Sequence, residues 1–277
     1  MSESIVLPGI EPGIYSNQVL SNEAYHADRE YVSSSGLKML PYRTDEFIAR
    51  YQMTQKAESR SEALKFGGGL HSAILEPDIF PTEYVVEPVV NKRTNDGKAE
   101  LLAFYKSVEA EGKTVLTPDD MDLIRAMRNT VNQHPIAGKA LMGAVMEQSF
   151  FHAGDLLKQK VRTDAFKNNI IMDLKSCENI DKFHQSVAEY GYNFSEAMYK
   201  TVISDVINEP VHFLFIAVQK SYPFTVSVFE SDDEMKSEGY KKYIAAVETY
   251  AELKETGKWA EIRSMSLPNW AKPKDNF

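Results

Sequence analysis

The feature that most constrains the fold is a change of hydrophobic period in the middle of the chain. Three segments there have strand length and are separated by short polar turns: EQSFFHAG (147–154), KQKVRTDAF (158–166) and NNIIMDLKSC (168–177). They predict three consecutive β-strands. The third is a nearly continuous apolar run, which is typical of a buried central strand. The chain is therefore expected to build layers of helices around a sheet.

The segments on either side predict those layers. Ser33, Ser34 and Ser35 end an irregular N-terminal arm and predict the cap of a helix that carries Leu37 and Leu40. Further helices are predicted at 61–77, 97–111, 118–133, 136–146, 179–190, 193–207 and 232–255, and further strands at 211–219 and 224–230. Helices before, between and after strands indicate an α/β fold with one mixed central sheet flanked by helices.

The chain shows no internal repeat, low-complexity tract or long linker. We therefore expect a single domain over 1–277. It would consist of an N-terminal arm and helix (1–60), a core (61–230) and a C-terminal helix with its tail (231–277).

Two acids and a lysine lie at the rim of the third strand. Side chains alternate along a strand, so Asp173 and Lys175 are expected on the same side. Asp164, at the end of the preceding strand, lies beside Asp173 if the two strands form a hairpin. Neighbouring carboxylates repel each other, and a divalent cation such as Mg²⁺ removes that cost. The alternative is a pair of surface acids with a nearby lysine, because D-x-K triplets are common by chance.

Two further residues favour a metal site. Glu147 starts the first strand of the block and is expected at the same end of the sheet. His71 follows Gly67, Gly68 and Gly69 on the helix at 61–77. Glycines cost helix stability, so their presence suggests that a backbone or ligand approaches closely there, unless they mark a break between two helices. A helix lying close to the sheet would bring His71 near the acids.

Composition limits the other possibilities. Cys177 is the only cysteine, which excludes an internal disulfide and cysteine-based metal sites. Neither a bilayer-spanning stretch nor a secretory signal is visible, so we expect a cytoplasmic protein without a membrane partner. The net charge of −9 argues mildly against nucleic acid. Short basic clusters at 92–93, 158–162 and 241–242 oppose that argument locally, so charge alone does not decide the partner.

The set His71, Glu147, Asp164, Asp173 and Lys175 resembles the PD-(D/E)xK nuclease superfamily, and more closely the nuclease domain of the RecE family (exonuclease VIII). The resemblance covers nearly the whole chain. It rests also on these segments, which follow the same order: EPGIYSN, NEAYH, GGGLHSAILEP, NKRTNDGK, EGKTVLT, IIMDLKS and SLPNWAK.

The resemblance implies roles for single residues. His71, Asp164 and Asp173 would be ligands of Mg²⁺, for which Mn²⁺ is a possible substitute, and Lys175 would be the catalytic lysine that orients or deprotonates a water. Glu147 would lie beside the metal, and Tyr199 matches the tyrosine of the following helix. Ser195 departs from the family, which has a glutamine four residues before that tyrosine. This departure puts a substrate contact in doubt.

The resemblance also implies a function. The chain would be a Mg²⁺-dependent 5′→3′ exonuclease that degrades one strand of linear double-stranded DNA and leaves 3′ overhangs for recombination by strand annealing. Its partners would be duplex DNA ends, a single-strand annealing protein of the RecT type and copies of itself, in a ring of which a tetramer is the first expectation. The ring would carry several of the basic clusters in its lumen. The alternatives are another DNA end-processing nuclease of this fold and an inactive DNA-binding or protein-interaction module.

Overall fold

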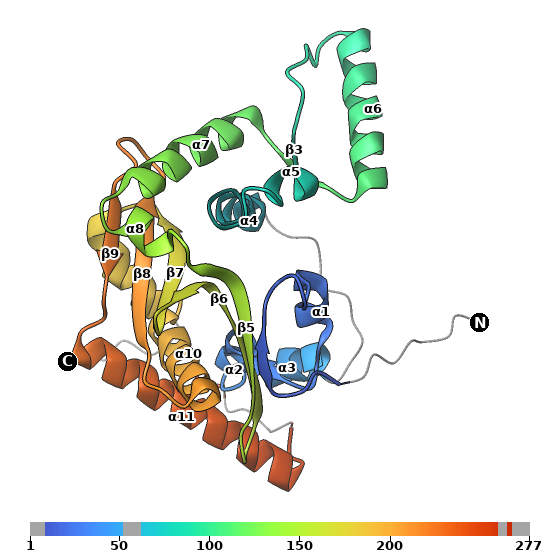
Figure 1. Cartoon of the computed structure of the whole chain (residues 1–277). Helices are drawn as coiled ribbons and strands as arrows, with labels where there is room; N and C mark the ends of the chain where they lie inside the picture. The colour runs from blue at the N-terminus through green and yellow to red at the C-terminus, as the bar shows by residue number, and fades with distance from the viewer. Residues whose placement is uncertain (1–8, 52–61, 260–264, 268–277) are drawn as a thin grey trace, which may run out of the picture.

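A computed structural model describes residues 9–51, 62–259 and 265–267, and its main feature is one mixed sheet (Figure 1). The strands run in the order β1-β5-β6-β7-β8-β9, and β2 pairs with β6. Their bounds are β1 Gly13–Tyr15, β2 Val32–Ser33, β5 Val145–Ala153, β6 Lys158–Lys167, β7 Ile170–Cys177, β8 His212–Gln219 and β9 Val226–Phe229. All five long strands predicted from the sequence are present. The predictions that rest on residues 1–8, 52–61 and 268–277 lie outside the described residues.

The sheet is antiparallel except at two junctions. β5, β6 and β7 form an antiparallel meander, and β9 is antiparallel to β8. β7 and β8 are parallel, because a helical crossover connects them, and β2 is parallel to β6. The apolar β7 therefore lies between neighbours in the sheet and is covered on both faces, as its sequence predicts.

Helices cover both faces of the sheet (Figure 1). Their bounds are α1 Asn22–Ala27, α2 Ser34–Met39, α3 Thr44–Tyr51, α4 Glu62–Leu75, α5 Phe80–Glu83, α6 Asn95–Glu111, α7 Pro118–Gln133, α8 Ala137–Leu141, α9 Phe183–Glu189, α10 Tyr192–Ile207 and α11 Asp233–Thr256, with a short 3₁₀ turn at Ile180–Lys182. On one face α2, α9, α10 and α11 pack around Ile171 and Phe215. On the other, α4, α7 and α8 pack around Met172 and Ile216. Neighbouring positions along one strand thus enter different cores.

Two helix predictions need correction. The helix predicted at 136–146 ends at Leu141, because Gly143 adopts a left-handed conformation (φ 69°) and β5 begins at Val145. The helix with the glycine run is continuous, so the glycines do not break it. Gly69 itself faces the small sheet and α7: an added Cβ there would lie 3.3 Å from Leu116 and 3.2 Å from Ile124.

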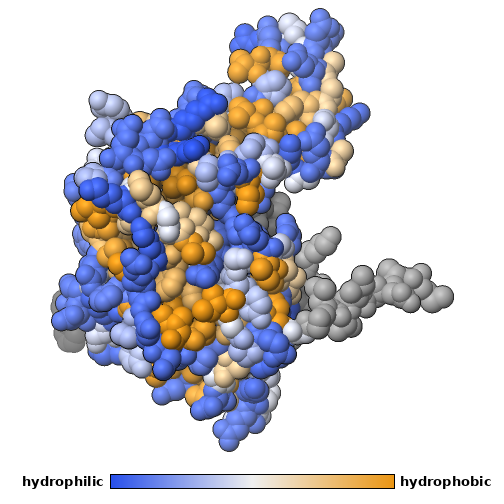
Figure 2. Space-filling model, viewed as in Figure 1, coloured by the Kyte–Doolittle hydropathy of each residue, from blue (hydrophilic) through white to orange (hydrophobic). Residues whose placement is uncertain are grey.

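A projecting arm was not predicted. Two three-residue parallel strands, β3 Tyr84–Val86 and β4 Thr114–Leu116, flank α6 and form a small separate sheet. The arm stands clear of the body in Figure 1, and Figure 2 shows hydrophobic surface on it. Exposed apolar residues of this part are Val89, Leu102 and Tyr105. Strands this short carry no readable period, which is why the sequence did not indicate them.

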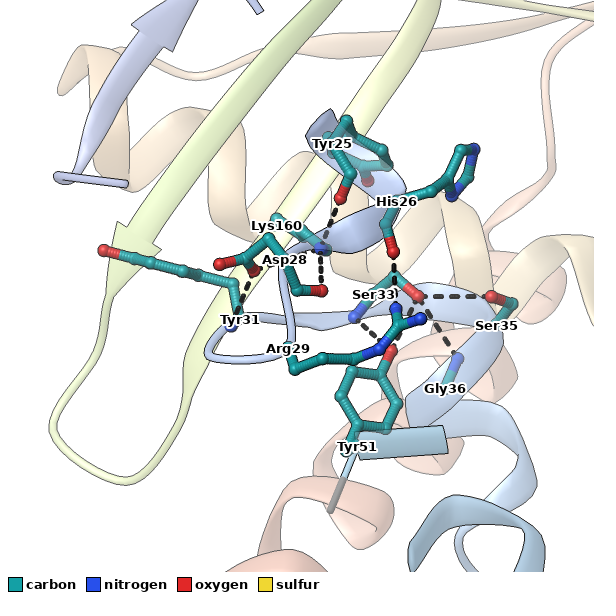
Figure 3. Close-up of polar contacts among 10 residues, drawn as sticks. All are labelled: Tyr25, His26, Asp28, Arg29, Tyr31, Ser33, Ser35, Gly36, Tyr51 and Lys160. Atoms are coloured by element: carbon teal, nitrogen blue, oxygen red, sulfur yellow. Dashed lines mark hydrogen bonds and ion pairs between the residues drawn. The ribbon is translucent and has the colours of Figure 1, made fainter. Parts of the chain in front are cut away.

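The N-terminal arm is tied to β6 by a buried lysine (Figure 3). Lys160, only 3% exposed, donates to the backbone oxygens of Tyr25 and Asp28 at 2.6 and 2.8 Å and to Asp28 Oδ1 at 3.0 Å. Arg162 is also buried, and Lys158 pairs with Glu30. Lys160 and Arg162 of the cluster 158–162 are thus bonded inside the chain instead of lying on an open surface. Whether any of the basic clusters faces a lumen remains a prediction.

No helix in the described parts of the chain is long and apolar enough to cross a membrane.

Candidate metal centre and active-site cleft

Three acids occupy one row across β5, β6 and β7. Met146 pairs with Ala165 and Gln148 with Thr163, so the same register sets Glu147 opposite Asp164. Ala165 pairs with Met172, so continuing that register sets Asp173 opposite Asp164 on the other side. β6 and β7 therefore form the antiparallel hairpin that was expected to bring Asp164 beside Asp173.

The ladder between β6 and β7 opens at this row. Pairing extends only from Lys167 to Ala165, although β6 itself continues, so Asp164 lies inside its strand and not at the end of it. Beyond the last pair, Asp164 Oδ2 accepts a hydrogen bond of 2.6 Å from the backbone N–H of Leu174. A side chain thus replaces the missing backbone partner, which fixes the Asp164 carboxylate at the fork.

His71, Glu147 and Asp164 form a group that is able to hold a metal ion. One ligand atom of each lies within 4.8 Å of the others, and His71 Nδ1 is 3.6 Å from Asp164 Oδ2. Glu147 has a left-handed backbone (φ 51°), which is rare for a residue with a side chain and which interrupts the ladder opposite Asp164. Such conformations persist where the surroundings enforce them, and they gather at functional sites.

Asp173 and Lys175 form the second part of the site. Lys175 Nζ lies 2.6 Å from Asp173 Oδ2 and 3.8 Å from Asp164 Oδ2, so the two residues share one side of β7, as predicted. The Lys175 ammonium also lies 5.4 Å from the ring centre of Tyr192. The sequence pointed to Asp173 as a metal ligand beside His71 and Asp164. The structure groups Glu147 with those two and pairs Asp173 with Lys175, and the ligand role of Asp173 remains a prediction.

Burial and mutual repulsion shift the pKa values of these acids upward. Burial, with help from the Asp164 charge, raises the pKa of Glu147 to about 8. Burial also raises the pKa of Asp173, and Lys175 opposes that shift. Burial alone would lower the pKa of Lys175, but the carboxylates of Asp173 and Asp164 outweigh it and raise that pKa above its usual value. Lys175 is thus an ammonium at neutral pH.

The donor set fits a hard divalent cation. Carboxylate oxygens are the ligands that Mg²⁺ and Mn²⁺ prefer, and two of the three donors are carboxylates. A dication would also relieve the repulsion that raises the pKa of Glu147. The acids oppose each other across two ladders, and burial with mutual repulsion raises the pKa of Glu147; both features indicate a place for positive charge.

The site opens into a cleft of about 930 Å³ between α4, the N-terminal arm and the sheet. Tyr199 and Ser195, predicted to contact substrate, both line this cleft. Tyr199 is deep in it, and burial raises its pKa well above the usual value. Ser195 lies at the α2 side, where its Oγ is 2.9 Å from Ser34 Oγ. All seven residues singled out from the sequence therefore line one cavity.

The sequence did not reveal three other polar residues of the cleft. Lys38 donates to Ser195, Arg162 donates to Ser149 Oγ at 2.7 Å, and Glu76 accepts from Asn17. Lys38 and Glu76 are far from the acids in sequence, and no local pattern marks them. Arg162 was visible two residues before Asp164, but it was assigned to a surface cluster.

Comparison with known proteins agrees with this site. Residues 33–263 match the family described as "PDDEXK-like domain of unknown function (DUF3799)". The chain belongs to this family. The match spans every site residue named above and confirms the resemblance to the PD-(D/E)xK superfamily and the predicted fold class. No curated protein sequence matches the chain.

One solved structure supports the same fold. A crystal structure of a protein from Eubacterium rectale, described provisionally as an exonuclease, aligns with a TM-score of 0.58 at 15% identity, over 90% of this chain and 96% of that one. A phage-related exonuclease from Haemophilus somnus 129PT aligns over 80% of this chain and 95% of that one, at 11% identity. Its TM-score of 0.27 is too low to carry an argument. At these identities the first alignment shows a shared fold, which agrees with the RecE-like resemblance.

Proposed function

We propose that the chain is a divalent-metal-dependent exodeoxyribonuclease, with Mg²⁺ as the ion used and Mn²⁺ as a substitute. The observation that carries this proposal is the row of Glu147, Asp164 and Asp173 with Lys175 beside it, on a nuclease fold. A chain without catalytic function has no physical reason to keep three mutually repelling acids in one row. The geometry therefore favours an active nuclease over an inert module.

Each residue has a defined task in this proposal. His71, Glu147 and Asp164 would hold the ion, which when bound stabilises negative charge developing on the phosphate and acidifies water. Asp173 holds the Lys175 ammonium in place through their 2.6 Å contact. Held between Asp173 and Asp164, the Lys175 ammonium would donate hydrogen bonds to the attacking water or to the phosphate. Its raised pKa favours this orienting role over the role of a base.

We further propose that the substrate is the 5′ end of linear duplex DNA and that the product carries a 3′ overhang for an annealing protein of the RecT type. The family resemblance supports this polarity. A ring of copies, first of all a tetramer, would keep the enzyme on one DNA end. It would also gather local positive charge within a protein of net charge −9. With Lys160 and Arg162 buried, the lumen charge would have to come from other residues.

A digestion assay tests the proposal. Linear duplex labelled at the 5′ end of one strand is incubated with the protein and Mg²⁺, beside a sample with EDTA and a closed circular duplex of the same sequence. We expect early loss of the 5′ label from the linear duplex, no digestion with EDTA, and an intact circle. Shortening of the labelled strand while it keeps its 5′ label would overturn the polarity. Digestion of the circle would indicate an endonuclease, and no digestion of any DNA would refute the proposal.

Asp164→Asn is the matched control in that assay. It keeps the shape of the side chain and the acceptor for the Leu174 N–H while removing the charge beside His71 and Glu147. Digestion should cease while the fold, checked by circular dichroism, remains. Wild-type activity in this variant would contradict the role proposed for Asp164.

A further inference from the structure

Lys38 reaches into the cleft from a helix that is remote in sequence from the acids. It lies on α2, and its Nζ is 3.0 Å from Ser195 Oγ and 3.3 Å from the backbone oxygens of Tyr190 and Gly191. Its aliphatic chain passes over Gly191, where an added Cβ would lie 3.3 Å from Lys38 Cδ. Gly191 has φ 62°, a conformation that favours glycine. Because glycine has no side chain, the backbone leaves room at this position for the aliphatic part of Lys38.

Lys38 differs from the other lysine and the arginine of the cleft in its partners. Lys175 is paired with Asp173, and Arg162 is buried and donates to Ser149 Oγ and the Leu20 oxygen. Within the described residues Lys38 forms no ion pair, and all three of its acceptors are uncharged. A part-buried ammonium without a carboxylate partner costs stability. Fold stability alone therefore does not account for a charge at this position.

The surroundings keep this charge available to an anion. Burial lowers the pKa of Lys38 to about 8, with Asp173 opposing that shift, so the amine is mainly protonated at neutral pH. Its two contacts of 3.3 Å are long, whereas an ammonium bonded to an anionic oxygen is typically about 2.7–2.9 Å away. The three N–H donors rotate about one bond, so an arriving anionic oxygen can replace a carbonyl without moving the helix.

The anion that this site fits is a phosphodiester. Lys38 and the Lys175–Asp173 pair line the same cleft, and the charge of Asp173 is near enough to affect the Lys38 amine. Ser195 is too short to extend far from α10, and Lys38, held by its hydroxyl, supplies the longer donor on that side. We propose that Lys38 is a substrate-binding residue that contacts a backbone phosphate of the bound DNA strand. The inference rests on the proposed function.

A purely structural role makes different predictions. Tyr190 ends α9, and a lysine near the carbonyl end of a helix stabilises it modestly. If that were its whole role, removing the charge would lower the melting temperature and leave DNA affinity and its salt dependence unchanged. A phosphate contact instead contributes to the salt dependence, because each neutralised phosphate releases counterions and adds about 0.9 to the slope of log K against log salt for duplex DNA.

The test measures binding of a fluorescent linear duplex by anisotropy at several salt concentrations, with Ca²⁺ in place of Mg²⁺. The variants are Lys38→Met and Lys38→Arg. The matched control is Lys254→Met, which removes one exposed charge from the last turn of α11. We expect Lys38→Met to bind about ten-fold more weakly, as for the loss of one charged hydrogen bond, and its salt slope to fall by about 0.9. Lys38→Arg should keep most of the affinity, and Lys254→Met should behave as wild type.

Each outcome is decisive. A Lys38→Met protein with wild-type affinity and salt slope overturns the inference, even if the wild-type enzyme digests DNA. An equal loss in Lys254→Met shows a general effect of net charge and also overturns it. If the wild-type protein binds no DNA at all, the proposed function fails and the inference fails with it. A lower melting temperature of Lys38→Met without a change of slope assigns the lysine to the structural role.

Discussion

Replacing Lys175 by methionine removes the charge at the centre of the site while keeping most of the side-chain length. The ammonium lies 2.6 Å from Asp173 and 3.8 Å from Asp164, and the three side chains are 21%, 13% and 16% exposed. Breaking a fully buried ion pair by removing one partner costs about 3–5 kcal/mol, because the other charge is left uncompensated. These groups keep some contact with water, so we expect a loss of about 3 kcal/mol in the free energy of unfolding.

Thermal unfolding in EDTA measures this loss. In a chain of this size 1 kcal/mol corresponds to about 2–4 °C, so Lys175→Met should melt about 6–12 °C below the wild type. The double variant with Asp173→Asn should recover most of the difference, since no unpaired charge remains at that pair. Both variants should digest duplex DNA about 10²–10³-fold more slowly, the usual loss for one donor that stabilises a transition state.

The result that would refute this reasoning is a Lys175→Met protein that melts and digests DNA like the wild type. It would show that the lysine is a surface group outside the chemistry. A stability loss that Asp173→Asn does not recover would show that the cost comes from packing and not from the unpaired carboxylate.

Three further predictions concern the metal site and the fold around it. Without metal, the raised pKa of Glu147 stabilises the protein at acidic pH, and this stability is lost as pH rises from about 4.5 through about 8. The melting temperature in EDTA should therefore fall across this window more steeply for the wild type than for Glu147→Gln. Equal slopes for the two proteins would contradict the pKa shift. The increase in melting temperature on adding Mn²⁺ should grow over the same pH window, because the ion needs the ionised carboxylate. An increase that does not depend on pH would argue against Glu147 as a ligand. Gly36→Ala should lower the free energy of unfolding by about 1–3 kcal/mol, because the new Cβ would lie 2.2 Å from Tyr51 Oη. The control is Gly67→Ala, whose new Cβ meets no atom within 4 Å. Equal melting temperatures of the two variants would refute the packing at Gly36.

The sequence predicted the strands and the acids well because both depend on local patterns. The period of 147–177 was enough to place β5, β6 and β7, and alternation along β7 put Asp173 and Lys175 on one side. His71 came from its place after three glycines. Gly69 faces Leu116 and Ile124 instead of the central sheet, whereas Gly68 lines the cleft, so the approach of a ligand to this helix remains a prediction.

What the sequence could not reveal depends on contacts between distant segments. Whether Lys160 is a surface charge or a buried anchor is decided by the N-terminal arm folding onto β6, more than 130 residues away in sequence. Lys38 reaches Ser195 only because α2 packs against α10, across 157 residues. The sequence put Glu147 beside the metal site, but it could not reveal the left-handed backbone of this residue, which a glutamate rarely adopts.

The most direct test of the account is a crystal structure of the protein soaked with Mn²⁺, with data collected to reveal anomalous scattering. The account predicts one strong peak about 2.0–2.6 Å from a ligand atom of each of His71, Glu147 and Asp164. The same map decides whether Asp173 turns from Lys175 to join them. A peak elsewhere in the chain, or a fully occupied ion that leaves these three side chains unligated, would contradict the central claim.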